Sequence, residues 1–226
     1  KDKTGFIWYQ GKCNLFYQCF PYAPQWGRMH WGHAVSKDLV NWEEKGIALY
    51  PTKTDDRSGC FSGSAVEQDG TMYLYYTGVN YLEEDPENIN HCRNDQFLSA
   101  QMMISSADGR TFDNLQEKKT IIPPIAEDKI GSKTHTRDPK VWRGTDAWYM
   151  VLGSSVAHKG RLLIYQSRDL QNWKYLSHVE KDNFGWMWEC PDYFEVNGKG
   201  ITVFSPMAFL NDGKAYDSDL SVLHIR

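Results

Sequence analysis

Short apolar segments separated by tight turns make up most of the chain. Four stretches share one plan, an apolar run, a turn and a second apolar run, and they cover residues 5–18, 63–77, 138–152 and 190–205. Their aromatic and β-branched side chains are typical of strands, and the spacing of an amphipathic helix is absent between them. The dipeptides Asp69-Gly70 and Asn197-Gly198 favour hairpin turns because both residue types accept a positive φ. The pattern therefore predicts an all-β chain built from hairpins.

A second repeat lies between these hairpins. Its three copies are "SKDLVNW" at 36–42, "SADGRTF" at 106–112 and "SRDLQNW" at 167–173. The interval between copies is long enough for four strands and their turns, so each period is predicted to form one four-stranded blade. About four such blades fit into the chain, which predicts a β-propeller. A β-sandwich with regularly spaced turns is the alternative.

Two stretches lack the alternation of a strand, residues 81–96 and 114–136. We predict that both are long loops. Long loops in compact domains often carry function, and the second one leads directly into the "RDP" segment at 137–139. It is expected either to border a functional site or to decorate the surface.

Length and charge exclude several classes of function. The chain has 226 residues, of which 41% are hydrophobic, enough for one globular domain without a second. Its 25 basic and 29 acidic residues give a formal net charge of −4 without a long run of one sign. Nucleic acid and anionic membrane surfaces are therefore not expected as partners. The sequence also contains no apolar run of the length that a membrane span requires.

Cysteine and histidine positions argue against disulfides and metal. The five cysteines form no C-x-x-C pair, which predicts reduced thiols and a reducing, cytoplasmic compartment in a bacterium. No leader-like segment opens the chain, although a leader removed before residue 1 would be compatible with it. His30 and His33 should point to opposite faces of a strand, so no metal site is expected, and no other cofactor.

Three carboxylates are predicted to meet near the propeller axis. Asp2, Asp138 and Glu189 each come at or just before the start of an inner strand, in three different repeats. Cleavage of a glycosidic bond needs such a set, because one acid protonates the leaving oxygen while a carboxylate meets the developing positive charge. The sequence therefore predicts a glycosidase site.

Their neighbours suggest different roles for two of these acids. Trp186 and Trp188 flank Glu189, so we expect desolvation to raise the pKa of this carboxyl and suit it to proton transfer. Asp138 follows Arg137, whose permanent charge would keep the aspartate ionised if the two side chains meet.

Six segments together resemble glycoside hydrolase family 32, the invertase and sucrose-6-phosphate hydrolase family. They are "GFIWYQGKCNLFYQ", "WGRMHWGHAVSKDLVNWEE", "GCFSGSAV", "LYYTG", "RDPKVW" and "MWECPD", and they follow the family order along nearly the whole chain. The resemblance implies a five-bladed propeller. Residues 1–226 would then form one catalytic domain with about four blades, without the fifth blade and the β-sandwich that the family usually carries. An open propeller edge would allow self-association.

The resemblance also implies roles for particular residues. It makes Asp2 the nucleophile, Asp138 the transition-state stabiliser and Glu189 the acid/base. The residues implied to line the fructosyl subsite are Gln18, Trp26, Phe61, Ser62 and Arg137. The family nucleophile lies in an N-D-P-N-G segment, and "KDKTG" at residues 1–5 departs from that pattern on both sides of Asp2.

The implied activity is that of a retaining β-fructofuranosidase that needs no cofactor. Its partner would be a small sugar, sucrose or sucrose 6-phosphate, from which the terminal β-fructofuranosyl unit is released. A fructan hydrolase acting on inulin or levan is one alternative. A catalytically weakened propeller that binds sugar without turnover is another, because the segment around Asp2 is altered.

Overall fold

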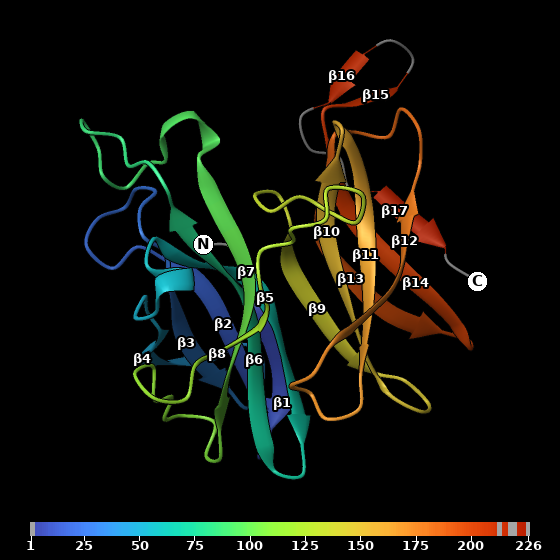
Figure 1. The fold of residues 1–226 in the computed structure, drawn as a ribbon. Helices are drawn as coiled ribbons and strands as arrows, with labels where there is room; N and C mark the ends of the chain where they lie inside the picture. Colours follow the sequence, from blue (N-terminus) through green and yellow to red (C-terminus); the bar gives the residue numbers. More distant parts are fainter. Residues whose placement is uncertain (1–2, 212–213, 217–220, 225–226) are drawn as a thin grey trace. The chain divides into compact units, whose positions relative to one another are not determined.

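The computed structural model describes residues 3–211, 214–216 and 221–224, and it confirms an all-β chain (Figure 1). The chain divides into two compact units, Lys1–Pro123 and Pro124–Arg226. Each unit contains two antiparallel blade-like sheets, and in the three four-stranded ones the strands follow one another in sequence. The prediction of hairpins, and of about four blades, is therefore confirmed. Within the described residues no helix is long and apolar enough to cross a membrane.

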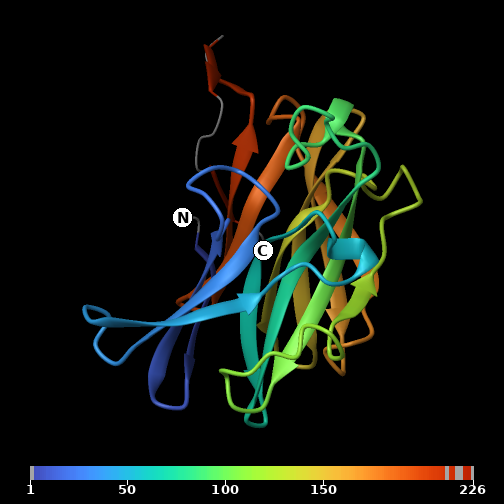
Figure 2. The same ribbon diagram turned by 90° about the vertical axis from the view of Figure 1, so that its left-hand side faces the viewer.

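Unit 1 contains two four-stranded sheets with the orders β1-β2-β3-β4 and β5-β6-β7-β8. The strands of the first sheet are β1 (Lys3–Tyr9), β2 (Lys12–Cys19), β3 (His30–Ser36) and β4 (Trp42–Leu49). The strands of the second are β5 (Gly59–Gln68), β6 (Thr71–Tyr81), β7 (Phe97–Ser106) and β8 (Lys119–Ile122). Two 3₁₀ turns, η1 (Thr54–Asp56) and η2 (Arg93–Asp95), lie in the connections. The first sheet is twisted. In Figure 2 the turn between β3 and β4 points away from the turn between β1 and β2.

Unit 2 contains the four-stranded sheet β12-β11-β10-β9, the three-stranded sheet β13-β14-β17 and a two-stranded ribbon. The strands of its first sheet are β9 (Arg137–Arg143), β10 (Trp148–Val156), β11 (Lys159–Ser167) and β12 (Lys174–Glu180). The second sheet is made of β13 (Met187–Val196), β14 (Lys199–Met207) and β17 (Ser221–His224). The ribbon pairs β15 (Phe209–Asn211) with β16 (Lys214–Tyr216).

Each unit buries apolar side chains around one core. In unit 1 the largest fully buried side chains of the core include Phe16, Trp31, Leu74 and Tyr76, which come from both sheets. In unit 2 the indole of Trp188 stacks on the ring of Phe204, with 4.2 Å between ring centroids. The middle strands β3, β6 and β10 are buried at nearly every position, so both faces of these strands are covered.

The two repeats seen in the sequence correspond to two kinds of turn. The inner hairpins turn at Asp69-Gly70 and Asn197-Gly198, and all four residues have the positive φ that the dipeptides predict. The three seven-residue copies connect the third and fourth strands of their sheets. In each copy an aspartate Oδ1 accepts two backbone N–H groups, and the residues are Asp38, Asp108 and Asp169. These hydrogen bonds, together with one from the Asn172 side chain that has the largest effect on Asp169, hold the pKa of the three carboxyls below the ordinary range, because they favour the charged form.

The prediction that 114–136 is a loop throughout is wrong. Residues Lys119–Ile122 form β8, the outermost strand of the second sheet, which pairs with β7. The strand has only four residues, so its alternation was too short to recognise. Next to it the Lys118 ammonium is fully buried and pairs with Asp56 at 2.6 Å. The buried Lys118 therefore could not be distinguished from a loop lysine in the sequence.

Candidate active site

The four inner hairpins share one irregularity at the place where the sequence predicts functional residues. The pairing register shifts between Lys3 and Gly5 in β1, between Cys60 and Gly63 in β5, and between Glu189 and Asp192 in β13. The fourth shift, between Val151 and Gly153 of β10, lies opposite Asp138 and Pro139 of β9. A β-bulge at each of these points redirects side chains that regular alternation would place elsewhere.

Asp138 lies at the bulge of unit 2 and is 6% exposed. Its backbone has φ 64°, a left-handed conformation that is uncommon for aspartate. The backbone N–H of Cys190 donates to Oδ2 of Asp138 at 2.9 Å. Burial raises the pKa of this carboxyl, while the Arg137 charge and the Cys190 N–H act in the opposite direction. The bulge therefore turns a carboxylate inward and binds it to the neighbouring strand.

Arg137 pairs with Glu189, and its charge also acts on the neighbouring Asp138. Its Nε and Nη2 atoms donate to Oε1 of Glu189 at 3.1 and 2.6 Å. The side chains of the pair are 14% and 30% exposed, so Glu189 reaches solvent while Asp138 is buried. The expected environments are thus exchanged. The left-handed backbone of Asp138 at the bulge turns its carboxylate inward, whereas the Arg137 side chain reaches the carboxylate of Glu189 on β13.

Close packing of strands brings Glu189 next to Asp138. A Cβ atom added to Gly153 of β10 would lie 1.9 Å from the carbonyl oxygen of Trp188 in β13. Only glycine lets the two backbones approach so closely. The structure therefore brings Arg137, Asp138 and Glu189 together within unit 2, as their common spacing in the repeats predicts.

The segment that leads into β9 is fixed by hydrogen bonds. Arg161 donates from Nη1 to the carbonyl oxygen of Lys129 at 2.8 Å. The hydroxyls of Thr136 and Ser154 lie 2.7 Å apart, and the Thr136 hydroxyl also donates to the Ser132 carbonyl at 2.6 Å. These contacts hold the residue just before Arg137 in place. The segment therefore borders the carboxylate pair, one of the two alternatives that its sequence left open.

Sequence reasoning missed two groups near the pair. Nδ1 of His135 lies 3.5 Å from Nη1 of Arg137, and the imidazole packs edge-to-face against Trp186 with 5.1 Å between centroids. The backbone of Cys190 supplies the donor to Asp138, with φ 48°. The charge of Asp138, followed by burial, raises the pKa of the Cys190 thiol. A thiol held protonated is a poor nucleophile. The "ECP" segment itself was the only signal that could have indicated this backbone role.

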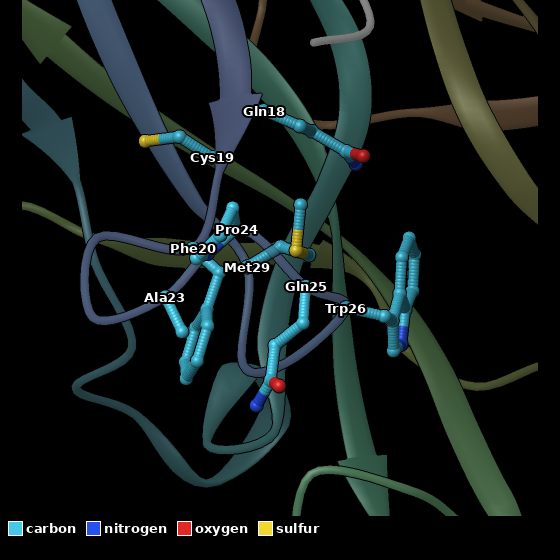
Figure 3. A pocket seen from close by; sticks show the side chains of 8 residues that line it. All are labelled: Gln18, Cys19, Phe20, Ala23, Pro24, Gln25, Trp26 and Met29. Atoms are coloured by element: carbon cyan, nitrogen blue, oxygen red, sulfur yellow. The ribbon is translucent and has the colours of Figure 1, made fainter.

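Unit 1 carries the predicted fructosyl-subsite residues other than Arg137. Gln18 is buried at the end of β2, and it lines a hollow together with Trp26 and Met29. In Figure 3 the side chains of Gln18 and Trp26 extend to one side of the β2 strand and its loop, and Cys19 to the other. The hollow has a volume of about 430 Å³. Both side chains therefore line the same hollow of unit 1.

Phe61 and Ser62 occupy the bulge of β5, and both are half-buried. The rings of Phe61 and Trp26 meet edge-to-face with 5.3 Å between centroids. The Trp31 indole donates to the Phe61 carbonyl at 3.0 Å, which fixes the bulge against the core. Phe61 and Trp26 thus form one aromatic wall.

Other predicted residues lie elsewhere or outside the described residues. Asp2, the predicted nucleophile, is outside them. His33 stacks on Phe16 and bonds to Asn14, whereas His30 donates from Nδ1 to the Arg28 carbonyl and lies near Tyr50. Among residues 3–208 and the described part beyond, no cluster of His, Cys, Asp or Glu has the arrangement of a metal site.

Comparison with known families gives one match that covers nearly the whole chain. The model of the family described as "Glycosyl hydrolases family 32 N-terminal domain" matches residues 1–221. Curated relatives include sucrose-6-phosphate hydrolases of Zymomonas mobilis and Bacillus subtilis, which are 37% and 35% identical over 94% and 96% of this chain. The alignments cover 41% and 43% of those proteins. The chain thus spans less than half the length of these relatives.

Solved structures agree with the family match. A β-fructofuranosidase of Bombyx mori has a TM-score of 0.81 and 38% identity over 98% of this chain and 44% of its own. A sucrose-6-phosphate hydrolase of Lactobacillus gasseri has a TM-score of 0.76 and 30% identity over 93% of this chain and 40% of its own. The predicted propeller fold is confirmed by these similarities.

Proposed function

The chain belongs to family 32 of the glycosyl hydrolases, and from this premise we propose that it acts as a retaining β-fructofuranosidase. The observation that carries the proposal is the Asp138–Glu189 arrangement, in which one carboxylate is buried and the other is half-buried and held by Arg137. Two acids in different environments can take different roles in one reaction. The bond that breaks joins a terminal β-fructofuranosyl unit to its leaving group.

The roles follow from the accessibility of each group. Glu189 reaches solvent, so its carboxyl can protonate the leaving oxygen and later accept a proton from water. Asp138 is buried and fixed by the Cys190 N–H, which suits it to hydrogen-bond a sugar hydroxyl and to stabilise positive charge. Asp2 is the proposed nucleophile, on the resemblance of "KDKTG" to the family segment. No group in this scheme requires a metal or an organic cofactor.

The proposed substrates are sucrose and sucrose 6-phosphate. Relatives named sucrose-6-phosphate hydrolase support them, and so does a Bombyx mori enzyme solved in complex with sucrose. Fructans are the alternative class, supported by a neighbour named fructan 1-exohydrolase that is 27% identical.

Release of fructose tests the proposal directly. Purified chain is incubated with sucrose and with sucrose 6-phosphate, and fructose, glucose and glucose 6-phosphate are quantified. Hydrolysis that depends on Asp2, shown by its loss in the Asp2→Asn variant, is the expected result. Sugar binding without any release of fructose would contradict the enzyme and favour a sugar-binding propeller, the second function that the altered Asp2 segment suggests.

Two further proposals concern the protein's surroundings. All five cysteines are free thiols, which supports a reducing, cytoplasmic compartment. If the protein isolated from cells had the mass of a form with oxidised cysteines, this result would contradict a reducing compartment. Self-association through an open sheet edge stays a prediction. Sedimentation of a monomer at every concentration would rule it out.

A further inference from the structure

The connection between β6 and β7 continues their hairpin beyond the ends of the two strands. It covers residues 82–96, and in Figure 1 it lies above the loop that follows β2. The Leu82 N–H donates to the Gln96 carbonyl at 2.7 Å, and Glu84 pairs with Cys92 as an isolated antiparallel bridge. These backbone contacts give residues 82–96, which we call the extension, a defined conformation. No step of the proposed reaction uses it.

One ion pair ties the extension to the loop that carries Trp26. Nη2 of Arg28 donates to Oε1 of Glu84 at 2.7 Å, and the two side chains are 35% and 38% exposed. Arg28 follows Trp26 by two residues, whereas Glu84 lies 56 residues beyond Arg28 along the chain. Because the partners are distant in sequence, the pair fixes the position of one loop relative to the other.

The Trp26 side chain reaches the extension by a second route. Tyr81, the last residue of β6, is 4% exposed, and its hydroxyl donates to the carbonyl of Asn90 in the extension at 3.4 Å. Burial raises the pKa of Tyr81, and a hydrogen bond from the Trp26 side chain acts in the opposite direction. The donor of this bond is the indole N–H. Trp26 is nevertheless 45% exposed, so its ring is held at the polar end and leaves part of its surface for a ligand.

The Arg28–Glu84 pair is strong enough to position a loop, although not to stabilise the domain. Exposed ion pairs change an equilibrium constant by at most about fivefold. Unfolding of the whole domain involves far larger free energies, whereas loops open locally at a cost close to zero. The pair therefore acts mainly on the conformation of the Trp26 loop.

A sugar without a phosphate gives a simple way to detect this effect. It carries no charge for Arg28 or Glu84 to attract, so the pair acts on its affinity through the position of neighbouring groups. Salt screens exposed charges, and the Debye length decreases from about 30 Å at 0.01 M to about 3 Å at 1 M ionic strength. A salt-dependent affinity for a neutral sugar is therefore a signature of the ion pair.

We propose that Arg28 and Glu84 are a positioning pair that holds the Trp26 indole in contact with the fructosyl unit. The inference rests on the proposed function, in which Trp26 lines the fructosyl subsite. It makes the extension a determinant of substrate affinity that acts through Trp26 and not by direct contact with the sugar. Reversing one charge of the pair displaces the indole and weakens binding of the fructosyl unit.

Calorimetric titration of the full chain with fructose tests the pair without turnover. Glu84→Arg places two like charges together, and the double variant Arg28→Glu with Glu84→Arg restores an ion pair in the reverse sense. Glu83→Arg is the matched control, because Glu83 pairs with Arg93 at 3.2 Å inside the extension. Glu84→Gln removes only the charge, and it keeps the test valid if the reversed charge prevents folding.

The expected result is a loss of fructose affinity of about fivefold in Glu84→Arg, equivalent to about 1 kcal/mol. The double variant should recover an affinity within about twofold of the parent, and Glu83→Arg should stay within the same range. An increase in salt from about 0.01 M to about 1 M should weaken binding to the parent by about threefold, because it screens the pair. Binding to Glu84→Gln should not change with salt.

Three results would overturn the positioning pair. They are an equal loss in Glu84→Arg and Glu83→Arg, no recovery in the double variant, and the same salt dependence in the parent and in Glu84→Gln. Fructose binding that depends on the pair, in a chain that releases no fructose from sucrose, would overturn the proposed function alone. Hydrolysis of sucrose by a chain whose fructose affinity is the same in all variants would overturn only the positioning pair.

Discussion

Arg137 donates two hydrogen bonds to one oxygen of Glu189, from Nε at 3.1 Å and from Nη2 at 2.6 Å. Its third nitrogen, Nη1, faces His135 at 3.5 Å. A planar guanidinium fixed at three points holds the carboxylate in one orientation. Arg137 is therefore a positioning residue for the proposed acid/base.

Arg137→Lys should lower kcat/KM for sucrose by roughly a hundredfold. The lysine ammonium keeps the positive charge but cannot donate two parallel hydrogen bonds to the Glu189 carboxylate. Displacement of a catalytic group by about 1 Å lowers the rate by roughly a hundredfold. Steady-state kinetics measure the effect. Lys140→Ala is the matched control, because Lys140 forms the other ion pair between β9 and β13, with Asp192 at 2.6 Å. A loss as large in the control would show that the strands had merely shifted.

Asp138→Asn should stabilise the fold more at neutral than at acidic pH. Burial raises the pKa of the folded carboxyl above the ordinary value of 3.8, so between 3.8 and the folded pKa only the folded chain holds the proton. Stability of the parent therefore falls as the pH rises through this window, whereas asparagine does not titrate. Thermal unfolding at about pH 4 and pH 7 measures the difference in Tm. A difference that shrinks toward pH 7 would show that ionised Asp138 is favoured by the fold.

His33 should make unit 1 sensitive to acid. Burial, and then the charge of Lys45, lowers the pKa of this imidazole from 6.5 to about 4. As the pH falls below 6.5, His33 of the unfolded chain binds a proton, whereas His33 of the folded chain stays neutral down to about pH 4. The free energy of unfolding therefore decreases as the pH falls from 6.5 to about 4. A shift of this size is equivalent to about 3 kcal/mol.

Denaturant unfolding between pH 4 and pH 7 checks the role of His33. His33→Gln should flatten the dependence, whereas the exposed His91→Gln variant should leave it as in the parent. An unchanged slope in His33→Gln would assign the acid sensitivity to other groups.

The repeated turns allow a paired test of backbone strain. Leu39, Gly109 and Leu170 occupy the same position of the three copies, with φ between 64° and 66°. Leu39 is 56% exposed, whereas Leu170 is 2% exposed. Leu39→Gly should therefore leave stability unchanged or raise it by up to about 1 kcal/mol, because it removes a left-handed leucine. Leu170→Gly should lower stability by about 2 kcal/mol or more, since burial is lost as well.

Urea unfolding of both leucine variants measures this contrast. The middle copy supplies a third variant, because a Cβ at Gly109 would lie 2.5 Å from Cε1 of Tyr9. Gly109→Ala should therefore destabilise the chain. Destabilisation by Leu39→Gly as large as that by Leu170→Gly would contradict the assignment of strain to this position.

The sequence was sufficient to predict the hairpins and the meeting of two acids. Asp69-Gly70 and Asn197-Gly198 define turns by local chemistry alone, and repetition placed Asp138 and Glu189 at equivalent points of two sheets. Local chemistry could not predict which acid Arg137 binds. That choice depends on bulges, whose register is set by the partner strand and leaves no periodic signal.

Two other features depended on tertiary contacts. The four residues of β8 form a strand because they pair with the edge strand β7. Lys118, next to β8, can be buried because Asp56 neutralises its charge. Trp186 and Trp188 look equivalent in the sequence, yet Trp188 packs on Phe204 while Trp186 lines a hollow. The segment containing Trp186 precedes the regular strand, so its orientation follows no alternation.

The most direct measurement of the central claim compares two leaving groups in the Glu189→Gln variant. Sucrose releases a poor leaving group that needs a proton, whereas p-nitrophenyl β-fructofuranoside releases a good one that does not. If Glu189 is the general acid, release of glucose from sucrose should slow by about 10²–10⁴-fold, while release of p-nitrophenol in the first turnover, before the water step that Glu189 also assists, should slow far less. An equal loss on both substrates, or full activity toward sucrose, would contradict the role assigned to Glu189.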